Sequence, residues 1–355
     1  MPTSPSTQMS WPAEDGFYFP AEWERQRGVW LSWPHHPNTW ADCREEVLRD
    51  YAAFIAAISH FTKVFLNHPP GQEGTVGAIL AKARASLSNI ALFPHLTDDS
   101  WCRDHGPIFL KHSSTGEIAI TDWEFNAWGG KFPSTLDNQI PAKIASATGY
   151  RHYRIPFILE GGSIDTDGQG TLLTTRSCLL NPNRNKGLAP DEIESVLRRG
   201  LGIRNIWWLE EGLEGDDTDG HIDDITRFAP DGVILTAWEE DPQDPNHQAL
   251  AKNFRHLETW VKKDSRPREI VRLPMPARLE YQGQRLPASY ANFLVINGAV
   301  LMPSFAQPEK DQAAAKILQK AFPNRQIVPV DSRVFVRESG ALHCLSQQEP
   351  FAEKG

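Results

Sequence analysis

The chain carries an internal repeat, and this repeat limits its possible folds more than any other feature of the sequence. Five segments share a glycine followed by a short apolar run, and these glycines are Gly28, Gly106, Gly170, Gly232 and Gly298. The intervals between them are 78, 64, 62 and 66 residues. Repeats of such similar length indicate copies of one supersecondary unit, each burying its apolar face against its neighbours.

Each copy is expected to contain a hairpin, a helix and a strand. In the last three copies the glycine closes a turn signal, DGQG, APDG or ING, between two runs of strand-forming residues. Helical periodicity is found in residues 44–59, 191–201, 248–263 and 310–322. Short apolar strands follow these helices at residues 63–67, 204–209, 268–274 and 325–330.

The sequence therefore predicts a single closed α/β domain in which the repeats surround an axis. No linker rich in Pro, Gly or Ser separates the copies, which argues against several domains. The functional site is expected where the hairpin ends converge. An irregular α/β protein with coincidental spacing is the alternative.

Composition and charge exclude several classes of protein. A hydrophobic fraction of 40% over 355 residues, with 12 Trp and 17 Phe, is typical of a globular chain with a large core. The net charge of -9 argues against a nucleic-acid partner, because phosphates require a basic protein surface. No apolar run reaches the length of a membrane span, so no membrane partner is expected either.

The sequence also predicts a cytoplasmic protein. The first residues, MPTSPSTQMS, lack the charged start and apolar centre of a secretory signal, and residues 1 to about 14 are expected to form a polar tail. The four cysteines are scattered, which suits neither a disulfide framework nor a zinc site, and a reducing cytosol is the simplest location for them. They are Cys43, Cys102, Cys178 and Cys344.

Side chains suited to catalysis concentrate in four segments, WCRDHGP, ILEGGSIDTDGQGTLL, EGDDTDGHIDDITRF and ESGALHCLSQQ. Each has a purely structural explanation as well, because an isolated cysteine is usually a small buried apolar residue and an acid beside Gly or Pro often organises a turn. In chain order, the residues of interest are Asp104, Glu160, His221 with Asp223, and His343 with Cys344.

The segment His221-Ile222-Asp223 is the most informative of these. In an extended strand residues two apart point to the same face, so the imidazole and the carboxylate would share one site while Asp224 points away. By the same argument His343 would face away from its neighbour Cys344, which leaves His221 as the partner base. A metal site is disfavoured because no further His or Cys lies nearby at ligand spacing, and GDDTDG lacks the closing Glu of a calcium loop.

Together these segments resemble the agmatine deiminase and bacterial peptidyl-arginine deiminase family of guanidino-modifying enzymes. The resemblance runs from PAEWERQRGVWLSWP through WCRDHGP, LEGGSIDTDGQGTLLTTRSCLLNPNRN and GDDTDGHIDDITRFAPDGVILTAW to LHCLSQQEP, nearly the whole chain. It implies one catalytic domain over residues 1–355 with the family's pentein fold, a five-fold pseudosymmetric α/β propeller of αββαβ-like units. It also implies catalysis with neither metal nor cofactor, which agrees with the lack of a P-loop or GxGxxG motif.

The resemblance implies a role for each residue of interest. Trp101 and Arg103 would lie in the substrate-binding region, and Arg103 is a candidate to bind a substrate carboxylate. The sequence departs from close agmatine deiminases at ESGALHC, where they have a glycine-rich stretch, and at Cys102 and His105, which affects the expected substrate choice more than the chemistry. The implied catalytic residues are Cys344 as nucleophile, His221 as general acid and base, Glu160 as its acidic partner, and Asp104 with Asp223 as guanidinium clamps.

Hydrolysis of a guanidinium calls for these groups, because its carbon shares charge with three nitrogens and is a poor electrophile. Two carboxylates match its planar donors, a thiolate is a strong nucleophile and an imidazole moves the protons. The first expectation is an agmatine deiminase that forms N-carbamoylputrescine and ammonia in polyamine synthesis. Its expected partner is a small cationic guanidino substrate, and a homo-oligomer is a candidate assembly. Peptidyl-arginine deimination is the runner-up and free arginine is third. A non-catalytic pentein binding protein would have no need to keep Cys, His and the acids together.

Overall fold

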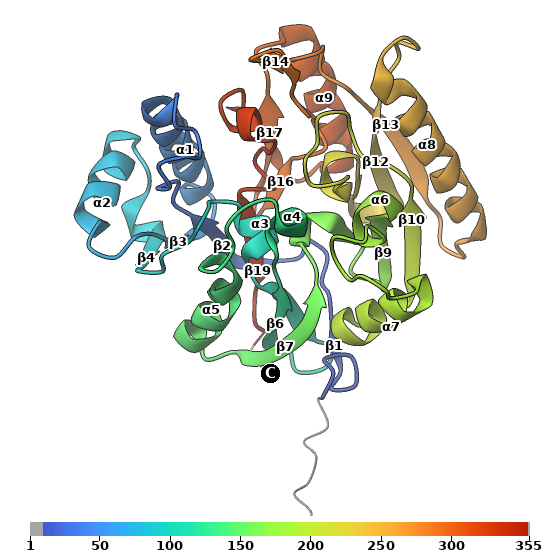
Figure 1. The fold of residues 1–355 in the computed structure, drawn as a ribbon, viewed down its shortest axis with the longest axis horizontal. Helices are drawn as coiled ribbons and strands as arrows, with labels where there is room; N and C mark the ends of the chain where they lie inside the picture. The colour runs from blue at the N-terminus through green and yellow to red at the C-terminus, as the bar shows by residue number, and fades with distance from the viewer. Residues whose placement is uncertain (1–9, 354–355) are drawn as a thin grey trace, which may run out of the picture.

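Five sheets share one connectivity, which is the structural form of the sequence repeat (Figure 1). In each, two antiparallel strands are followed, through at least one helix, by a third strand that lies parallel to the second. The structure is a computed structural model that describes residues 10–353. Its fold is mixed α/β.

The five units are built as follows. The first contains β19 (Ser346–Pro350), β2 (Gln26–Ser32), α1 (Arg44–Ser59) and β3 (Lys63–Asn67). The second contains β5 (Ile108–His112), β6 (Ile118–Glu124), α5 (Ile140–Thr148) and β7 (Arg151–Ile158). The third contains β8 (Ile164–Thr166), β9 (Thr171–Thr175), α7 (Pro190–Leu201) and β10 (Asn205–Leu209). The fourth contains β11 (Thr226–Phe228), β12 (Val233–Trp238), α8 (Pro245–Lys263) and β13 (Glu269–Pro274). The fifth contains β16 (Leu294–Ile296), β17 (Ala299–Ser304), α9 (Pro308–Ala321) and β18 (Gln326–Asp331).

Short elements complete these units or connect them. The additional strands are β1 (Phe17–Tyr18), β4 (Ile90–Phe93), β14 (Glu280–Tyr281) and β15 (Gln284–Arg285). The additional α-helices are α2 (Glu73–Lys82), α3 (Cys102–His105), α4 (Ala127–Gly130) and α6 (Arg176–Leu179). The 3-10 turns are η1 (Leu87–Asn89), η2 (Asp137–Gln139), η3 (Gly161–Ser163), η4 (Ile222–Asp224), η5 (Pro230–Gly232) and η6 (Phe335–Glu338). Figure 1 shows the long helices of the five units around the outside, with α3 and α4 near the centre.

The three predicted hairpins are confirmed. Strand β8 pairs antiparallel with β9, β11 with β12 and β16 with β17. In the last of these, Ile296 faces Ala299 across the turn Asn297-Gly298, and Gly298 has a positive φ of 75°. Asn-Gly supplies this conformation at little steric cost, which is why the sequence signal was strongest there.

The first two copies of the repeat differ from the prediction. Gly106 precedes the first strand of its hairpin, whereas the structural counterpart of the other glycines is Gly116, in the turn between β5 and β6. Gly28 lies within β2, and its antiparallel partner is β19 at the other end of the chain. A turn motif indicates pairing only between strands that are neighbours in the sequence, so it could not predict this pairing.

Helix α7 illustrates how local sequence fixes each unit. Pro190 begins the helix, where its missing N–H is not needed, and Gly202 ends it with a left-handed φ of 68°. Ile193 and Leu197 lie one turn apart on its inner face and are buried in a core cluster that includes Leu172 of β9. The helix therefore covers its own sheet.

The folded body begins earlier than the sequence indicated. Residues 11–16, assigned to or next to the expected polar tail, form hydrogen-bonded turns, and the Ala13 N–H donates to the Arg199 carbonyl of α7 at 3.0 Å. The Trp11 ring packs on the Arg199 guanidinium, 4.3 Å from its carbon. Residues 1–9 of the expected tail lie outside the described residues. None of the helices in the described part of the chain combines the length and the apolar character that crossing a membrane would require.

Candidate active site

A cavity of about 270 Å³ lies near the centre of the molecule, where the segments that precede α3 and β19 meet. Its buried lining includes Trp101, Asp104 and Cys344, whereas Asp217 and Glu338 are exposed. Among residues 10–353 the lining contains no Lys or Arg. The full set of lining residues is His36, Asn38, Thr39, Asp98, Asp99, Trp101, Asp104, Trp128, Phe132, Pro133, Asp217, Thr218, Glu338, Ser339, Gly340 and Cys344.

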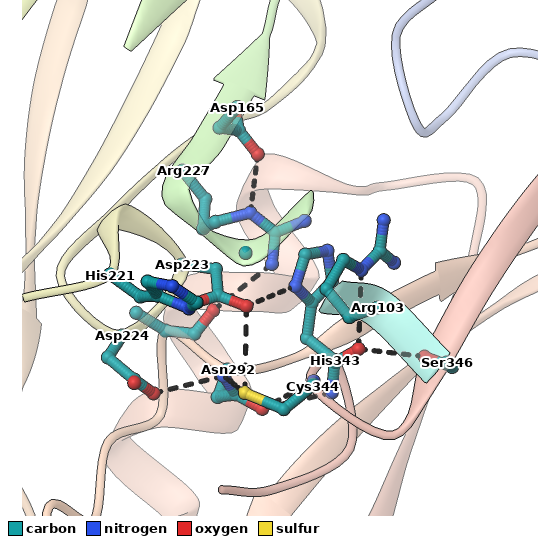
Figure 2. A network of polar contacts seen from close by, with 12 residues as sticks. Arg103, Asp165, His221, Asp223, Asp224, Arg227, Asn292, His343, Cys344 and Ser346 are labelled. Carbon is teal, nitrogen blue, oxygen red and sulfur yellow. Dashed lines mark hydrogen bonds and ion pairs between the residues drawn. The ribbon is translucent and has the colours of Figure 1, made fainter. Parts of the chain in front are cut away.

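Cys344 lies in the turn that leads into β19, with its sulfur among polar side chains (Figure 2). Its Sγ is 3.0 Å from Asn292 Nδ2 and 3.7 Å from Asp223 Oδ2. Burial and the carboxylates of Asp223 and Asp224 raise the pKa of the Cys344 thiol well above its usual range. In the absence of a bound cation, the sulfur is therefore a thiol at neutral pH.

Asp223 is held by a histidine on the side away from the cavity. His343 Nδ1 is 2.6 Å from Asp223 Oδ2, and His343 Nε2 is 2.9 Å from Glu22 Oε2. Burial opposes ionisation of Asp223, but the hydrogen bond and charge of His343 outweigh it and lower the pKa of this carboxyl. Asp223 is therefore the permanently charged acid of the site.

Asp104 is in the opposite electrostatic state. Its two oxygens accept hydrogen bonds from the Gly162 N–H at 2.8 Å and the Trp128 indole N–H at 3.0 Å. Even so, burial and the nearby Asp223 raise the pKa of the Asp104 carboxyl well above its usual value. A cation beside Asp104 would oppose this shift and favour the ionised carboxylate.

His221 and Glu160 lie near Asp104 and are fully buried. Burial lowers the pKa of the His221 imidazole to about 3, so the free imidazole is neutral. Glu160 Oε1 accepts from Arg184 Nε at 2.9 Å, and Glu160, Cys178 and His221 each offer a ligand atom within 4.8 Å of the others. His221 Nδ1 is also 3.7 Å from Asp104 Oδ1. The acid, the imidazole and the clamp are thus neighbours, and neither nitrogen of His221 has a hydrogen-bond partner among the described residues.

Gly162 makes this close approach possible. A Cβ at this position would lie 2.6 Å from His221 Nδ1, 2.8 Å from Asp104 Oδ1 and 3.1 Å from Asp223 Oδ2. Three site residues therefore converge on a space that no other amino acid leaves open, which is the physical reason for the Gly161-Gly162 pair after Glu160.

Comparison with known proteins places this geometry in a family. The model of the Porphyromonas-type peptidyl-arginine deiminases matches residues 18–350. The agmatine deiminase of Pseudomonas fluorescens strain Pf-5 is 38% identical over 373 residues, which cover 98% of this chain and 100% of that protein. The chain belongs to the Porphyromonas-type peptidyl-arginine deiminase family.

Solved structures of agmatine deiminases have the same fold. That of C. jejuni, a Cys-to-Ser variant with substrate bound, has a TM-score of 0.86 at 36% identity and covers 95% of this chain and 97% of its own. That of Enterococcus faecalis has a TM-score of 0.90 at 32% identity, with 97% and 98% covered. DDAH from Pseudomonas aeruginosa, at 15% identity and a TM-score of 0.50, shares the fold alone. The expected family and its mixed α/β architecture are thereby confirmed.

Most of the residues that the family resemblance singled out do come together. Cys344, His221, Glu160, Asp104 and Asp223 surround one small volume, and Trp101 lines the cavity above it.

Arg103 is the exception among the predicted substrate-binding residues. Its guanidinium points away from the cavity and donates to the side-chain oxygens of Gln347 and Gln348, both at 2.6 Å. It is buried there and is not positioned to bind a substrate carboxylate.

The expectation that the segments around His221 and Cys344 are extended strands is wrong. His221 and Asp223 do not lie in a strand, because η4 (Ile222–Asp224) begins just after the histidine. Asp224 consequently points into the site, 2.9 Å from Asn292 Nδ2. His343 and Cys344 both contact Asp223. They can do so because both lie in a turn and not in an extended strand.

Two further cysteines lie close to site residues in the sequence or in space. Cys102 comes two residues before Asp104, but α3 turns it into a core cluster with Trp30 and Phe109, and burial raises its thiol pKa to about 12. Cys178 lies 43 positions before His221 in the sequence and yet comes beside it. It was missed because spacing along the chain says nothing about contacts between units.

Two residues that contact the site, Asn292 and Trp128, carried no recognisable signal in the sequence. Asn292 lies inside a strand-like run, and Trp128 lies in the short element α4, in which all four residues, 127–130, have positive φ angles. The Gly129-Gly130 pair was the available sign of an unusual backbone there. Nothing in the sequence near Asn292 distinguishes it from a residue of the hairpin.

Proposed function

We propose that this chain is an agmatine deiminase, which hydrolyses the guanidinium of agmatine to N-carbamoylputrescine and ammonia. The observation that carries the proposal is that the Cys344 thiol lines an acidic cavity, in which no described Lys or Arg takes part. Similarity to agmatine deiminases over nearly the whole chain supports it, as does the substrate-bound C. jejuni relative with a Cys-to-Ser replacement.

The charge distribution of the cavity suits agmatine, which has a cation at each end. Its guanidinium would lie between Asp104 and Asp223, whose oxygens match planar N–H donors. Its ammonium would reach the exposed carboxylates of Asp217 and Glu338. Free arginine has a carboxylate near that end, and these acids would repel it.

In the first half of the reaction, the proton of the Cys344 thiol passes to the neutral His221 as the guanidinium binds. The thiolate attacks the guanidinium carbon, and a C–S bond forms as the C=N π electrons move to nitrogen. His221 then gives its proton to a terminal nitrogen, the C–N bond breaks and ammonia leaves a covalent thiouronium. Glu160 holds the imidazole and favours its charged form.

In the second half, water adds to the thiouronium carbon while the neutral His221 accepts a proton from it. The C–S bond breaks, its electron pair returns to sulfur, and the added hydroxyl loses its proton as the carbonyl of the ureido product forms. Ammonia takes up that proton as ammonium, and His221 returns its own proton to the Cys344 thiolate. The chain of proton transfers uses His221 twice, as acid and then as base, which is why its pKa must depend on the charge of its neighbours.

We further propose that the five units form a five-fold pseudosymmetric propeller, in which the site lies on the axis. The shared connectivity of the five sheets and the outer position of their helices support this arrangement. A cytoplasmic location fits the four cysteines, all of which are free thiols.

The test compares ammonia release from agmatine, free arginine and a blocked arginyl peptide, with Cys344→Ala as the negative control. We expect turnover of agmatine that Cys344→Ala abolishes, and little from the other two. Turnover of the peptide with none of agmatine would instead show peptidyl-arginine deimination. Ammonia from none of the three would reject the deiminase function, and activity lost on dialysis against EDTA and restored by zinc would reject the metal-free mechanism.

A further inference from the structure

Asn292 contacts the sulfur of Cys344, although nothing in the family resemblance gave it a role (Figure 2). It lies two residues before β16 and is fully buried. Its carboxamide makes four hydrogen bonds, and all of them end on site residues. They join Nδ2 to Asp224 Oδ1 at 2.9 Å and to Cys344 Sγ at 3.0 Å, and Oδ1 to the N–H groups of His343 at 2.9 Å and Cys344 at 3.3 Å.

The orientation of this carboxamide follows from its partners. The backbone N–H groups of His343 and Cys344 can only donate, so the atom that faces them must be the oxygen. The amide nitrogen therefore faces Asp224 and the sulfur, and its two hydrogens are directed at these two acceptors. If the carboxamide were flipped, its NH2 group would face the N–H donors of His343 and Cys344. Its carbonyl oxygen would then face the Asp224 carboxylate.

The sulfur needs such a donor because its surroundings oppose ionisation. Burial, Asp223, Asp224 and Asp104 all raise the pKa of Cys344, and a backbone contact of Ala341 acts in the other direction. An N–H group binds an anionic acceptor about twice as strongly as a neutral one. The Asn292 amide therefore stabilises the thiolate more than the thiol.

Stabilising the thiolate increases its fraction but lowers its nucleophilicity, and the magnitudes of these two effects decide whether the rate rises or falls. Each unit by which the thiol pKa falls toward the ambient pH raises the thiolate fraction about tenfold, while the lower basicity reduces nucleophilicity only about threefold. The net effect is a gain as long as the pKa lies above the ambient pH. The same bond favours departure of sulfur when the thiouronium is hydrolysed.

We propose that Asn292 is a catalytic residue, whose amide donates a hydrogen bond to the Cys344 sulfur and so maintains the thiolate as nucleophile and as leaving group. The proposal rests on the proposed function only for the identity of the substrate. The hydrogen bond to sulfur can be tested without any substrate.

The first experiment measures the thiol pKa in the full-length enzyme from the pH dependence of thiolate ultraviolet absorbance and of alkylation by iodoacetamide. The variants are Asn292→Leu, which keeps the approximate size of the side chain without donor or charge, Asn292→Ala, which removes the carboxamide, and Asn292→Asp, which replaces the donor with an acceptor and adds a carboxyl beside Asp224. Asn297→Asp is the matched control. Its amide lies in the same hairpin and donates to the Gln26 carbonyl at 2.8 Å, away from the sulfur.

We expect the thiol pKa to rise by about one unit or more in the Asn292 variants and to stay unchanged in Asn297→Asp. With agmatine, kcat should fall about 10- to 10²-fold while KM changes by less than about threefold, because the bond strengthens after binding.

An unchanged thiol pKa in Asn292→Leu would overturn the proposal, even if kcat fell, because it would leave only a structural role. An equal shift in Asn297→Asp would overturn it as well. If Asn292→Ala does not fold, the uncharged Asn292→Leu decides, because Asn292→Asp also adds a charge. Absence of deiminase activity in the wild type would reject the proposed function and leave the thiol measurement valid.

Discussion

The residues around Cys344 oppose the reaction until a cation arrives, and this is the main electrostatic feature of the site. Three carboxyl groups surround a buried thiol whose pKa they raise. A guanidinium placed between Asp104 and Asp223 would neutralise them, which lowers the thiol pKa and makes attack possible. The substrate's own charge thus activates the nucleophile, and reagents of different charge should reveal it.

The first prediction compares chloroacetamidinium with chloroacetamide, which has nearly the same shape and no charge. The cation should inactivate the enzyme about 10- to 10³-fold faster at neutral pH, because the acidic cavity concentrates it beside the sulfur. Inactivation by the neutral reagent should keep rising with pH beyond the usual thiol range, since the pKa of Cys344 is raised. Peptide mass mapping should place the label on Cys344 alone. Cys102→Ser serves as the control, and label that disappears in this variant would show that the nucleophile is misassigned.

The two clamp residues should respond differently to the same substitution. Asp104→Asn and Asp223→Asn should each lower kcat/KM about 10²- to 10³-fold by removing an anion from a cation site. Asp223→Asn should also lower the free energy of unfolding by about 1.5–3 kcal/mol, because it loses a charged hydrogen bond with His343.

Asp104→Asn should change the free energy of unfolding little. The pKa of Asp104 is raised in the folded protein, so its carboxyl ionises more readily in the unfolded chain and opposes folding as the pH rises above its usual value. Asparagine removes that effect at neutral pH, which offsets the loss of one accepted hydrogen bond. Urea unfolding of both variants checks the contrast, and equal destabilisation would show that Asp104 is charged in the free enzyme.

At the scale of elements, short turns rather than strands carry the chemistry. Asp104 comes from α3, Asp223 from η4, and Cys344 from a turn beside β19. The sequence identified the strands that support these turns, because hairpin signals and apolar runs are local. It could not give the side-chain directions, since two-residue alternation holds only where the backbone is extended, and this explains the errors for Asp224 and His343.

Gly162→Ala tests how tightly these turns meet. The added methyl would overlap His221, Asp104 and Asp223, so their side chains must shift by tenths of an ångström or more. We expect kcat to fall about 10²-fold or more with the fold retained, because misplacement of this size disrupts proton transfer. Gly77→Ala in α2 is the matched control, since a Cβ there meets nothing within 4 Å. It should stabilise the protein by about 0.5–1 kcal/mol without altering kcat.

At the scale of the whole molecule, the two ends of the chain complete one unit between them. Strand β19 pairs with β2 from Ser346 with Leu31 onward, and Cys344 lies just before this strand. The repeat in the sequence predicted a closed arrangement of units, but it did not predict that β19 and β2 form the closing pair, because pairing between strands so far apart in the sequence leaves no local signal. The turn that holds Cys344 is therefore positioned by a contact between strands at opposite ends of the sequence.

Glu349 tests this closure. It is buried in β19 and accepts hydrogen bonds from the Trp30 indole at 2.8 Å in β2, from Arg27 at 2.6 Å and from Tyr150 at 2.6 Å. Glu349→Ala would leave the buried Trp30 N–H without an acceptor, and we expect the free energy of unfolding to fall by about 2–4 kcal/mol. Because β19 holds the turn of Cys344, activity at a fixed temperature should be lost at a lower urea concentration than in the wild type.

The matched control for Glu349→Ala is Glu353→Ala. Glu353 follows in the same segment but is exposed, and its ion pair with Lys111, at 3.4 Å, should contribute no more than about 1 kcal/mol. Tryptophan fluorescence and Cys344 alkylation should report one common urea transition in each variant, since a single domain unfolds as a unit. Two separate transitions would show that the chain holds more than one cooperative unit. Equal destabilisation by the two substitutions would show that pairing of β19 with β2 does not depend on the buried acid.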